Sequence, residues 1–280
     1  MNSRIPTDEE INLLIARALE EDIGIGDVTT DSILVDDPVR EAVVTAKEPM
    51  VLCGIEIFKK VFLRLEPETQ FPQNSVSDGA TIPQNGEIII VRARCSTLLK
   101  GERTALNILQ RLSGIATMSR RLVEAAGPVK ILDTRKTTPG LRVFEKYAVR
   151  CGGGENHRFG LFDAVLIKDN HIRAAGSITE AVARVRKKNL THGFVEVETT
   201  NLDEVKEALS AGVDIIMLDN METRQICEAV KTVAKQARIE VSGSMNLERV
   251  RELSSTGIDF ISVGALTHSV KSMDISMNFS

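Results

Sequence analysis

Several residue types that mark particular functions are scarce in this chain. It has no tryptophan and one tyrosine, so it lacks the aromatic side chains on which single-stranded nucleic acids stack. The four cysteines form no CxxC pair and have no metal-ligand spacing, which favours reduced thiols in a cytoplasmic protein. We find no apolar signal-peptide segment and no run long enough to span a bilayer. These absences argue against nucleic-acid-binding, secreted and membrane proteins.

The overall charge is slightly acidic. The 280 residues include 35 basic and 39 acidic side chains, which gives a formal net charge of −4. The chain therefore lacks the global positive field of a nucleic-acid-binding protein. Hydrophobic residues make up 42% of the sequence, which is enough for one large domain or two of ordinary size.

The N-terminal part mixes helix and strand patterns without regular alternation. Thr7 and Glu10 form a capping box before an amphipathic helix. Residues 39–47 and 87–94 are strand-like, and residues 55–65 form an amphipathic helix pattern. This order predicts an α+β domain over residues 1–112.

A longer helix pattern follows this region. It covers residues 96–112, is interrupted at Ser113-Gly114, and continues as a further helix to Ala126. We expect the second domain, residues 113–267, to begin at this interruption.

After residue 128, apolar strand patterns alternate with helix patterns. The strand patterns end near Asp133, Lys168, Glu198, Asp219, Ser242 and Gly264. Such alternation predicts a parallel sheet with right-handed crossovers. About 150 residues are too few for a complete eight-stranded barrel, so we expect an incomplete α/β barrel of about six or seven strands. A doubly wound open sheet is the second choice.

Charged residues gather at the predicted strand ends, where ligands bind in such sheets. The cations are Arg135, Lys136, Arg158 and Lys168, with His157 beside them. Each one alone could be a solvated surface charge. Together they suit a ligand that carries several carboxylates or phosphates.

The later strand ends offer different chemistry. Glu198 and Asp219 could hold ribose hydroxyls or Mg²⁺, although Asp219 could also merely cap the next helix. The Ser242-Gly243-Ser244 turn and Gly264 could expose backbone N–H groups to a phosphate. An ordinary turn at Ser242-Gly243 is the alternative.

The same segments resemble a known family. Residues 133–172, DTRKTTPGLRVFEKYAVRCGGGENHRFGLFDAVLIKDNHI, are similar to the signature of the quinolinate phosphoribosyltransferases. GERTALNILQRLSGIAT, VEVE, IIMLDNM, VSGSMN and ISVGALTHS resemble further blocks of that family, in the same order. The resemblance implies decarboxylating transfer of phosphoribose from phosphoribosyl pyrophosphate to quinolinate, a step of NAD biosynthesis. It also implies an N-terminal α/β sandwich domain, joined by a tail of residues 268–280, and an incomplete α/β barrel.

The resemblance assigns roles to individual residues. It implies that quinolinate is bound by Arg103 of a second subunit together with Thr134, Arg135, His157, Arg158 and Lys168. It implies that phosphoribosyl pyrophosphate is bound by Lys136, Glu198, Asp219, Ser242, Gly243, Ser244 and Gly264. The implied catalytic residues are Lys136, Lys168, Glu198 and Asp219. Ser244-Met245 departs from the Gly-Ile that the family commonly shows.

The implied cofactor is Mg²⁺, carried mainly by the substrate, with a position near Glu198 and Asp219 as the alternative. No organic cofactor is expected. The implied assembly is a homodimer with shared active sites, or a hexamer. Neither nucleic acid nor a membrane is an expected partner.

Three other interpretations stay open at this point. The molybdenum-locus pyrophosphorylase-like proteins share the fold and many motifs of this family, and would act on another substrate. A class I aldolase would use Lys168 as a Schiff-base lysine at a barrel strand end. An anion-sensing or nucleic-acid-binding module is disfavoured by the acidic net charge and the missing aromatic residues.

Overall fold

We describe the protein from a computed structural model, in which residues 4–72, 76–188 and 193–279 are described. The chain divides into two compact units. The N-terminal unit contains Arg4–Arg120, Pro139–Gly153 and Val270–Ser280. The barrel unit contains Arg121–Thr138 and Gly154–Ser269. Within the described residues, no helix is both long and apolar enough to cross a membrane.

The N-terminal unit is built on a three-stranded antiparallel sheet in the order β11-β1-β4. The strands are β1 (Val39–Ala46), β4 (Glu87–Arg94) and β11 (Ile275–Phe279). Alternate residues of β1 are buried, which is the pattern of a sheet with one covered face. β11 comes from the C-terminal end of the chain, and its Ile275 lies opposite Ala46 of β1. A short antiparallel pair of strands, β2 (Met50–Val51) and β3 (Thr81–Ile82), completes the strands of this unit.

Helices supply the rest of the N-terminal unit. They are α1 (Asp8–Ile23), α2 (Thr30–Ile33), α3 (Ile55–Leu65), α5 (Arg142–Cys151) and most of α4 (Cys95–Ala126). The capping box predicted for α1 is present, because Thr7 accepts a hydrogen bond from the Glu10 backbone and the Glu10 side chain accepts one in return. Phe58 and Phe62 of α3 are fully buried, with ring centroids 5.2 Å apart.

The helix interruption predicted at Ser113-Gly114 is wrong, because α4 is one continuous helix from Cys95 to Ala126. Both residues instead serve close packing against neighbouring backbone. The Ser113 hydroxyl accepts a hydrogen bond from the Cys53 backbone N–H at 3.0 Å. A Cβ atom at Gly114 would lie 2.3 Å from the carbonyl oxygen of Lys271, so only glycine fits there.

The barrel unit contains a six-stranded parallel sheet in the order β5-β10-β9-β8-β7-β6. The strands are β5 (Lys130–Leu132), β6 (Val165–Ile167), β7 (Val195–Thr199), β8 (Ile215–Asp219), β9 (Arg238–Ser242) and β10 (Phe260–Ser262). An isolated parallel bridge between Leu132 and Glu155 extends the pairing beyond β5. The predicted incomplete α/β barrel is therefore confirmed.

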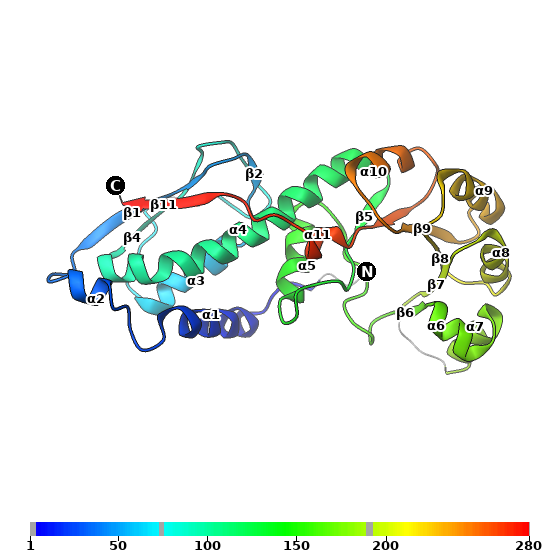
Figure 1. Ribbon diagram of the computed structural model, residues 1–280, viewed down its shortest axis with the longest axis horizontal. Helices are drawn as coiled ribbons and strands as arrows, with labels where there is room; N and C mark the ends of the chain where they lie inside the picture. Colours follow the sequence, from blue (N-terminus) through cyan, green and yellow to red (C-terminus); the bar gives the residue numbers. More distant parts are fainter. Residues whose placement is uncertain (1–3, 73–75, 189–192, 280) are drawn as a thin grey trace. The chain divides into compact units, whose positions relative to one another are not determined.

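Helices connect successive strands of the barrel unit. They are α6 (Asp169–Ala175), α7 (Ile178–Lys187), α8 (Leu202–Ser210), α9 (Thr223–Val233) and α10 (Leu247–Leu253), while α11 (Ala265–His268) follows the last barrel strand, β10. Figure 1 shows α7, α8 and α9 side by side along the outer side of the sheet. Asn201 and Asn246 are N-caps of α8 and α10, as predicted. This arrangement leaves the inner side chains of the strands to converge on one another.

The inner side of the sheet begins with an apolar floor, which we define as Leu132, Ile215 and Phe260 with Phe194 packed against them. The guanidinium of Arg238 lies 5.4 Å from the ring centre of Phe260 and 5.9 Å from that of Phe194. Toward the C-terminal ends of the strands, the inner side chains become polar and charged.

Candidate active site

A cavity of about 710 Å³ lies at the C-terminal ends of the parallel strands. Its walls contain every predicted site residue except Arg103, namely Thr134, Arg135, Lys136, His157, Arg158, Lys168, Glu198, Asp219, Ser242, Gly243, Ser244 and Gly264. All of these belong to the barrel unit. Arg103 is an exposed residue of α4 in the N-terminal unit and does not line this cavity.

The cationic part of the cavity is held in place by Asp133, which is fully buried at the end of β5. Its carboxylate accepts hydrogen bonds from the His157 backbone N–H at 2.9 Å and from the Asn156 side chain at 2.6 Å. Asp133 thereby fixes the segment that carries His157 and Arg158. The buried Arg158 guanidinium donates to the Ala164 carbonyl at 3.3 Å.

Arg158 and Arg135 form a cationic surface with little solvent around it. Burial lowers the pKa of Arg158 from its usual value, and the positive charge of Arg135 lowers it further. Both changes reflect an unfavourable environment for a bare positive charge. An anionic ligand would relieve that cost, so this wall of the cavity is suited to carboxylates.

Lys168 and Glu198 form an ion pair across the neighbouring strand ends of β6 and β7. The side chain of Lys168 is about two-fifths exposed, whereas that of Glu198 is mostly buried. The backbone N–H of Lys168 also donates to His171 Nδ1 at 3.0 Å, so His171 closes the first turn of α6. His171 does not line the cavity.

Another part of the cavity is formed by small residues and backbone, at Ser242, Gly243, Ser244 and Gly264. Gly243 has φ 135°, and a Cβ atom there would lie 2.6 Å from the Asn220 side-chain oxygen. Asn220 itself has φ 53°, in the left-handed region. The two turns after β8 and β9 are thus pressed closely together, and Gly243 is required there.

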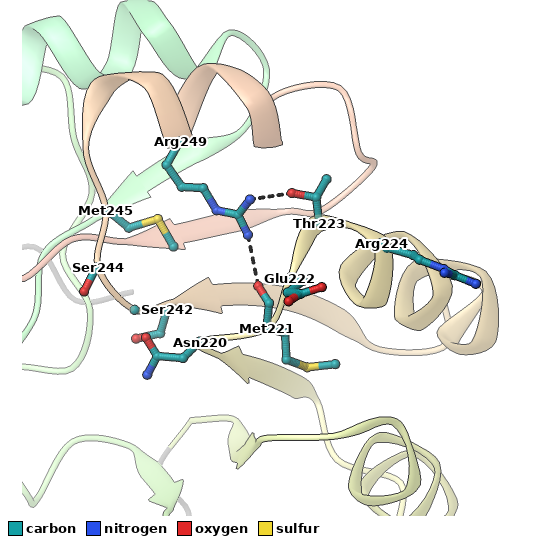
Figure 2. A pocket seen from close by; sticks show the side chains of 10 residues that line it. Asn220, Met221, Glu222, Thr223, Arg224, Ser242, Ser244, Met245 and Arg249 are labelled. Carbon is teal, nitrogen blue, oxygen red and sulfur yellow. Dashed lines mark hydrogen bonds between the residues drawn. The ribbon is translucent and has the colours of Figure 1, made fainter.

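A second cavity of about 520 Å³ adjoins these two turns and is lined by Asn220 to Arg224, Ser242 to Met245 and Arg249. Figure 2 shows Arg249 of α10 reaching across to the loop after β8. It donates hydrogen bonds to the Thr223 hydroxyl and, at 2.9 Å, to the Met221 carbonyl. Arg249 therefore braces the glycine-bearing turn against the start of α9.

A cluster of buried titratable side chains lies beneath the cationic wall. His157 Nε2 is 2.9 Å from Glu196 Oε2 and 3.6 Å from Glu240 Oε2. Both glutamates have no solvent exposure. Burial raises the pKa of Glu196 to about 7. Burial and the neighbouring Glu196 raise the pKa of Glu240 to about 8.

Two profile matches together cover nearly all of the chain. Residues 115–278 match the C-terminal domain of quinolinate phosphoribosyl transferase, and residues 27–113 match its N-terminal domain. The chain belongs to the quinolinate phosphoribosyltransferase family. The resemblance noted in residues 133–172 is therefore confirmed.

Individual relatives of this family are similar over most of their length. The "probable nicotinate-nucleotide pyrophosphorylase [carboxylating]" of Bacillus subtilis is 43% identical over 96% of this chain and 93% of its own. The "quinolinate phosphoribosyltransferase [decarboxylating] 1b" of Nicotiana tabacum is 41% identical over 94% of this chain and 81% of its own. The structure of the nicotinate-nucleotide pyrophosphorylase from Francisella tularensis is 41% identical, covers 99% of this chain and 98% of its own, and superposes with a TM-score of 0.94.

Sequence reasoning missed several residues that line the cavity in this family member, among them Asn220, Glu240, Ser262 and His268. A signal existed for two of them. Asn220 directly follows the strand-end Asp219, and its amide donates to that carboxylate at 2.9 Å. Glu240 precedes the strand-end Ser242 by two residues, and therefore points to the same face of β9. His268 lies in α11, where the sequence offered no strand-end pattern.

Proposed function

We propose that this protein transfers the phosphoribosyl group of phosphoribosyl pyrophosphate to quinolinate and releases CO₂ and pyrophosphate. The product is nicotinate mononucleotide, a precursor of NAD. The supporting observation is a single cavity that brings together a cationic wall, the carboxylates of Glu198 and Asp219, and a glycine-bearing turn. The names of the relatives favour quinolinate over the substrate of the related molybdenum-locus pyrophosphorylase-like proteins. We further propose a cytoplasmic location, where the four cysteines would stay reduced.

The cationic wall is assigned to quinolinate. This pyridine carries two adjacent carboxylates, so it needs several positive charges in a fixed array. Arg135, His157, Arg158 and Lys168 line one region of the cavity, and Thr134 adds a hydroxyl. Planar guanidinium groups suit carboxylates because they donate two parallel hydrogen bonds.

The remaining residues are assigned to the sugar donor. The Ser242-Gly243-Ser244 turn and Gly264 would bind phosphate through backbone N–H groups. Lys136 is placed beside them, since its side chain lies against Gly264. Glu198 and Asp219 would stabilise the positive charge that develops on the ribose as pyrophosphate leaves.

The pyridine nitrogen then forms the new bond to the ribose carbon, as the bond from that carbon to pyrophosphate breaks. The ring becomes a pyridinium, which attracts electrons. When the bond between the ring and the 2-carboxylate breaks, its electron pair remains on the ring carbon and CO₂ departs. A proton then binds to that ring carbon in place of the carboxylate. The protein positions the reactants and places charges around them, so the proposal requires no organic cofactor.

Mg²⁺ is proposed to enter with the phosphates of the donor. Such an ion usually keeps several waters and binds through substrate phosphates. Glu198 is already paired with Lys168, which makes it a poor ligand for a second cation. In the described ranges, neither Glu198 nor Asp219 belongs to a group of three side chains that could hold a metal. No step of the proposed reaction therefore depends on a metal that is bound only by the protein.

A product assay tests the proposed reaction. Purified protein, Mg²⁺ and phosphoribosyl pyrophosphate are incubated with quinolinate or with nicotinate, and CO₂, pyrophosphate and mononucleotide are measured. We expect equal amounts of the three products from quinolinate. Nicotinate carries one carboxylate, so it should react much more slowly. Turnover of nicotinate that equals or exceeds that of quinolinate would show that the substrate assignment is wrong.

We also propose a homodimer in which Arg103 completes the site of the partner subunit. The support is that Arg103 is exposed on α4 of the N-terminal unit, and that the family resemblance assigns it to the quinolinate site of a second subunit. Two inactive variants, Arg103→Ala and Lys168→Ala, are mixed under conditions that exchange subunits. One site of each mixed dimer then inherits both lesions and the other neither, so roughly a quarter of all sites should regain activity.

Native mass spectrometry confirms whether subunits have exchanged and whether the assembly is a dimer or a hexamer. If activity stays at the level of the parents after confirmed exchange, Arg103 does not act across subunits.

A further inference from the structure

Glu196 and Glu240 lie beneath the cationic wall and have no role in the reaction as proposed so far. Glu196 projects from β7 and Glu240 from β9, and both reach His157, which is 6% exposed. The ligand atoms of the three side chains lie within 4.8 Å of one another. Three ionisable groups in so small a buried volume need a defined distribution of protons.

The hydrogen-bonding pattern indicates where a proton lies. Among the described residues, Glu196 Oε1 and both carboxylate oxygens of Glu240 are buried without a hydrogen-bond partner. Two ionised carboxylates can only accept hydrogen bonds, so they cannot satisfy each other. A proton on one of them turns the contact into a donor–acceptor pair and removes one buried negative charge.

The surrounding charges decide which glutamate holds that proton. Glu196 faces the cations Arg158 and Lys168, which favour its ionised form, and the carboxylate of Glu198, which opposes it. Glu240 faces Glu196, His157 and the Ser262 hydroxyl, with no arginine or lysine among its main influences. Burial raises the pKa of both carboxyls, and the neighbouring Glu196 raises that of Glu240 further, so the cations beside Glu196 leave the proton on Glu240.

We propose that Glu240 is a positioning residue that holds a proton at neutral pH and donates it to Glu196, so that ionised Glu196 pairs with His157 as an imidazolium. His157 is thereby fixed as a cation in the wall that faces the dicarboxylate substrate. The substrate half of this inference rests on the proposed function. The charge state of the three side chains does not, and it can be tested without any substrate.

The charge state is tested by nuclear magnetic resonance on protein labelled with ¹⁵N-histidine. The chain has four histidines, and the His157 signals are assigned by their loss in His157→Asn. At pH 7 we expect both ring nitrogens of His157 to be protonated, and one of them to lose its proton in Glu196→Gln. A neutral His157 ring in the wild type, or an unchanged ring in Glu196→Gln, overturns the proposal.

The positioning role is tested by steady-state kinetics at pH 7. Glu240→Met removes the donor to Glu196 and keeps a side chain of similar length, so KM for quinolinate should rise about ten-fold or more. Glutamine at the same position is neutral and keeps an N–H donor, so Glu240→Gln should recover most of that loss. KM for phosphoribosyl pyrophosphate serves as the internal control and should change little. Equal KM values for quinolinate in Glu240→Met and the wild type contradict the proposal, as do equal losses in both Glu240 variants.

The pH profile separates this role from a merely structural one. Above pH 8 the wild type gains a second negative charge below His157, which weakens binding of a dianion. KM for quinolinate should therefore rise in the wild type relative to Glu240→Gln, which cannot ionise there. Parallel profiles count against the proposal.

A bound divalent cation is the competing explanation, because a histidine and two carboxylates can also ligate a metal. Elemental analysis of the purified protein distinguishes the two. We expect less than stoichiometric metal, unchanged in Glu240→Gln. One metal ion per chain that is lost in Glu240→Gln and Glu196→Gln would replace the shared proton with a metal site. If the ¹⁵N result holds but quinolinate is no substrate, the proposed function fails and the charge arrangement stands.

Discussion

The inner side of the parallel sheet changes character over a short distance along its strands. The floor consists of Leu132, Ile215 and Phe260, which are buried and apolar. The layer above it contains Glu196 and Glu240, which are buried and ionisable. The two layers are contiguous, because Glu196 pairs in register with Ile215, and Phe260 with Glu240.

The comparison indicates that different layers of the same strands serve stability and function. Burial of the apolar floor contributes to the stability of the barrel unit. The polar layer is costly to bury and is retained where it orients charges toward the cavity. Substitutions in the floor should therefore lower stability, whereas substitutions in the polar layer and above it should mainly change function and pH dependence.

The largest expected effect is on the floor. Phe260→Ala removes a ring that is 5% exposed and should lower the free energy of unfolding by about 3–5 kcal/mol, through lost burial and the cavity left behind. Urea denaturation measures this loss. KM for quinolinate in the folded fraction should stay close to the wild type. A loss below about 1 kcal/mol would show that the floor does not dominate the stability of this unit.

The next effect is on the charged strand ends. Lys168→Ala should leave a bound carboxylate and Glu198 without their cation, at a cost of about 2–5 kcal/mol of transition-state stabilisation, or at least about thirty-fold in rate. Lys168→Arg retains the charge with a different geometry and should keep partial activity. Stopped assays with quinolinate measure both variants, and urea denaturation checks that their stability is little changed.

Treatment with borohydride in the presence of a carbonyl substrate is the control for Lys168. A covalent adduct at Lys168 would indicate an aldolase-like nucleophile and contradict a role as a charge.

A smaller effect should appear in the pH dependence of stability. The pKa of Glu240 is raised from its usual value to about 8, so the folded state keeps a proton that the unfolded state loses. The stabilising contribution of this proton is complete below the unfolded pKa, near 4.5, and is lost as the pH rises through about 8. Glutamine does not ionise in this range, so Glu240→Gln does not lose stability in this way. The melting temperature of Glu240→Gln relative to the wild type should therefore rise between pH 5 and pH 8, as measured by calorimetry. A constant difference would mean that Glu240 is ionised throughout.

Much of the barrel unit could be predicted from the sequence, because its strands and helices are determined by residues that are close together in the chain. Apolar strand patterns that alternate with capped helices require a parallel sheet, and a parallel sheet brings its strand ends together. Arg135, Lys168, Glu198 and Ser242 therefore had to converge, and they line one cavity. The family resemblance added the roles, which geometry alone does not assign.

Features that depend on contacts between distant segments could not be predicted in this way. Gly114 looked like a helix break because glycine is a poor helix former, whereas its reason is the backbone of Lys271, far away in the sequence. The acid pair of Glu196 and Glu240 depends on strands β7 and β9, which are separated by β8 in the sheet. Neither contact leaves a periodic signal in the sequence.

The smallest expected effect concerns the lower edge of the floor. The Arg238 guanidinium lies over the rings of Phe194 and Phe260, at 5.9 and 5.4 Å from their centres, and the residue is exposed to solvent. A cation over an aromatic face at an exposed site contributes about 0.5–1 kcal/mol. Arg238→Met keeps an apolar side chain over the rings and removes the charge, so the free energy of unfolding should fall by about that amount.

Lys231→Met, at an exposed position on α9, is the matched control for losing one positive charge. Combining Arg238→Met with Phe260→Leu completes a double-mutant cycle that isolates the coupling between the cation and the ring. A coupling that matches the loss in the single Arg238 variant means that the cation stabilises the floor through this ring. If Arg238→Met and Lys231→Met change stability equally, the contribution is one of net charge, and the floor is stabilised by apolar packing alone.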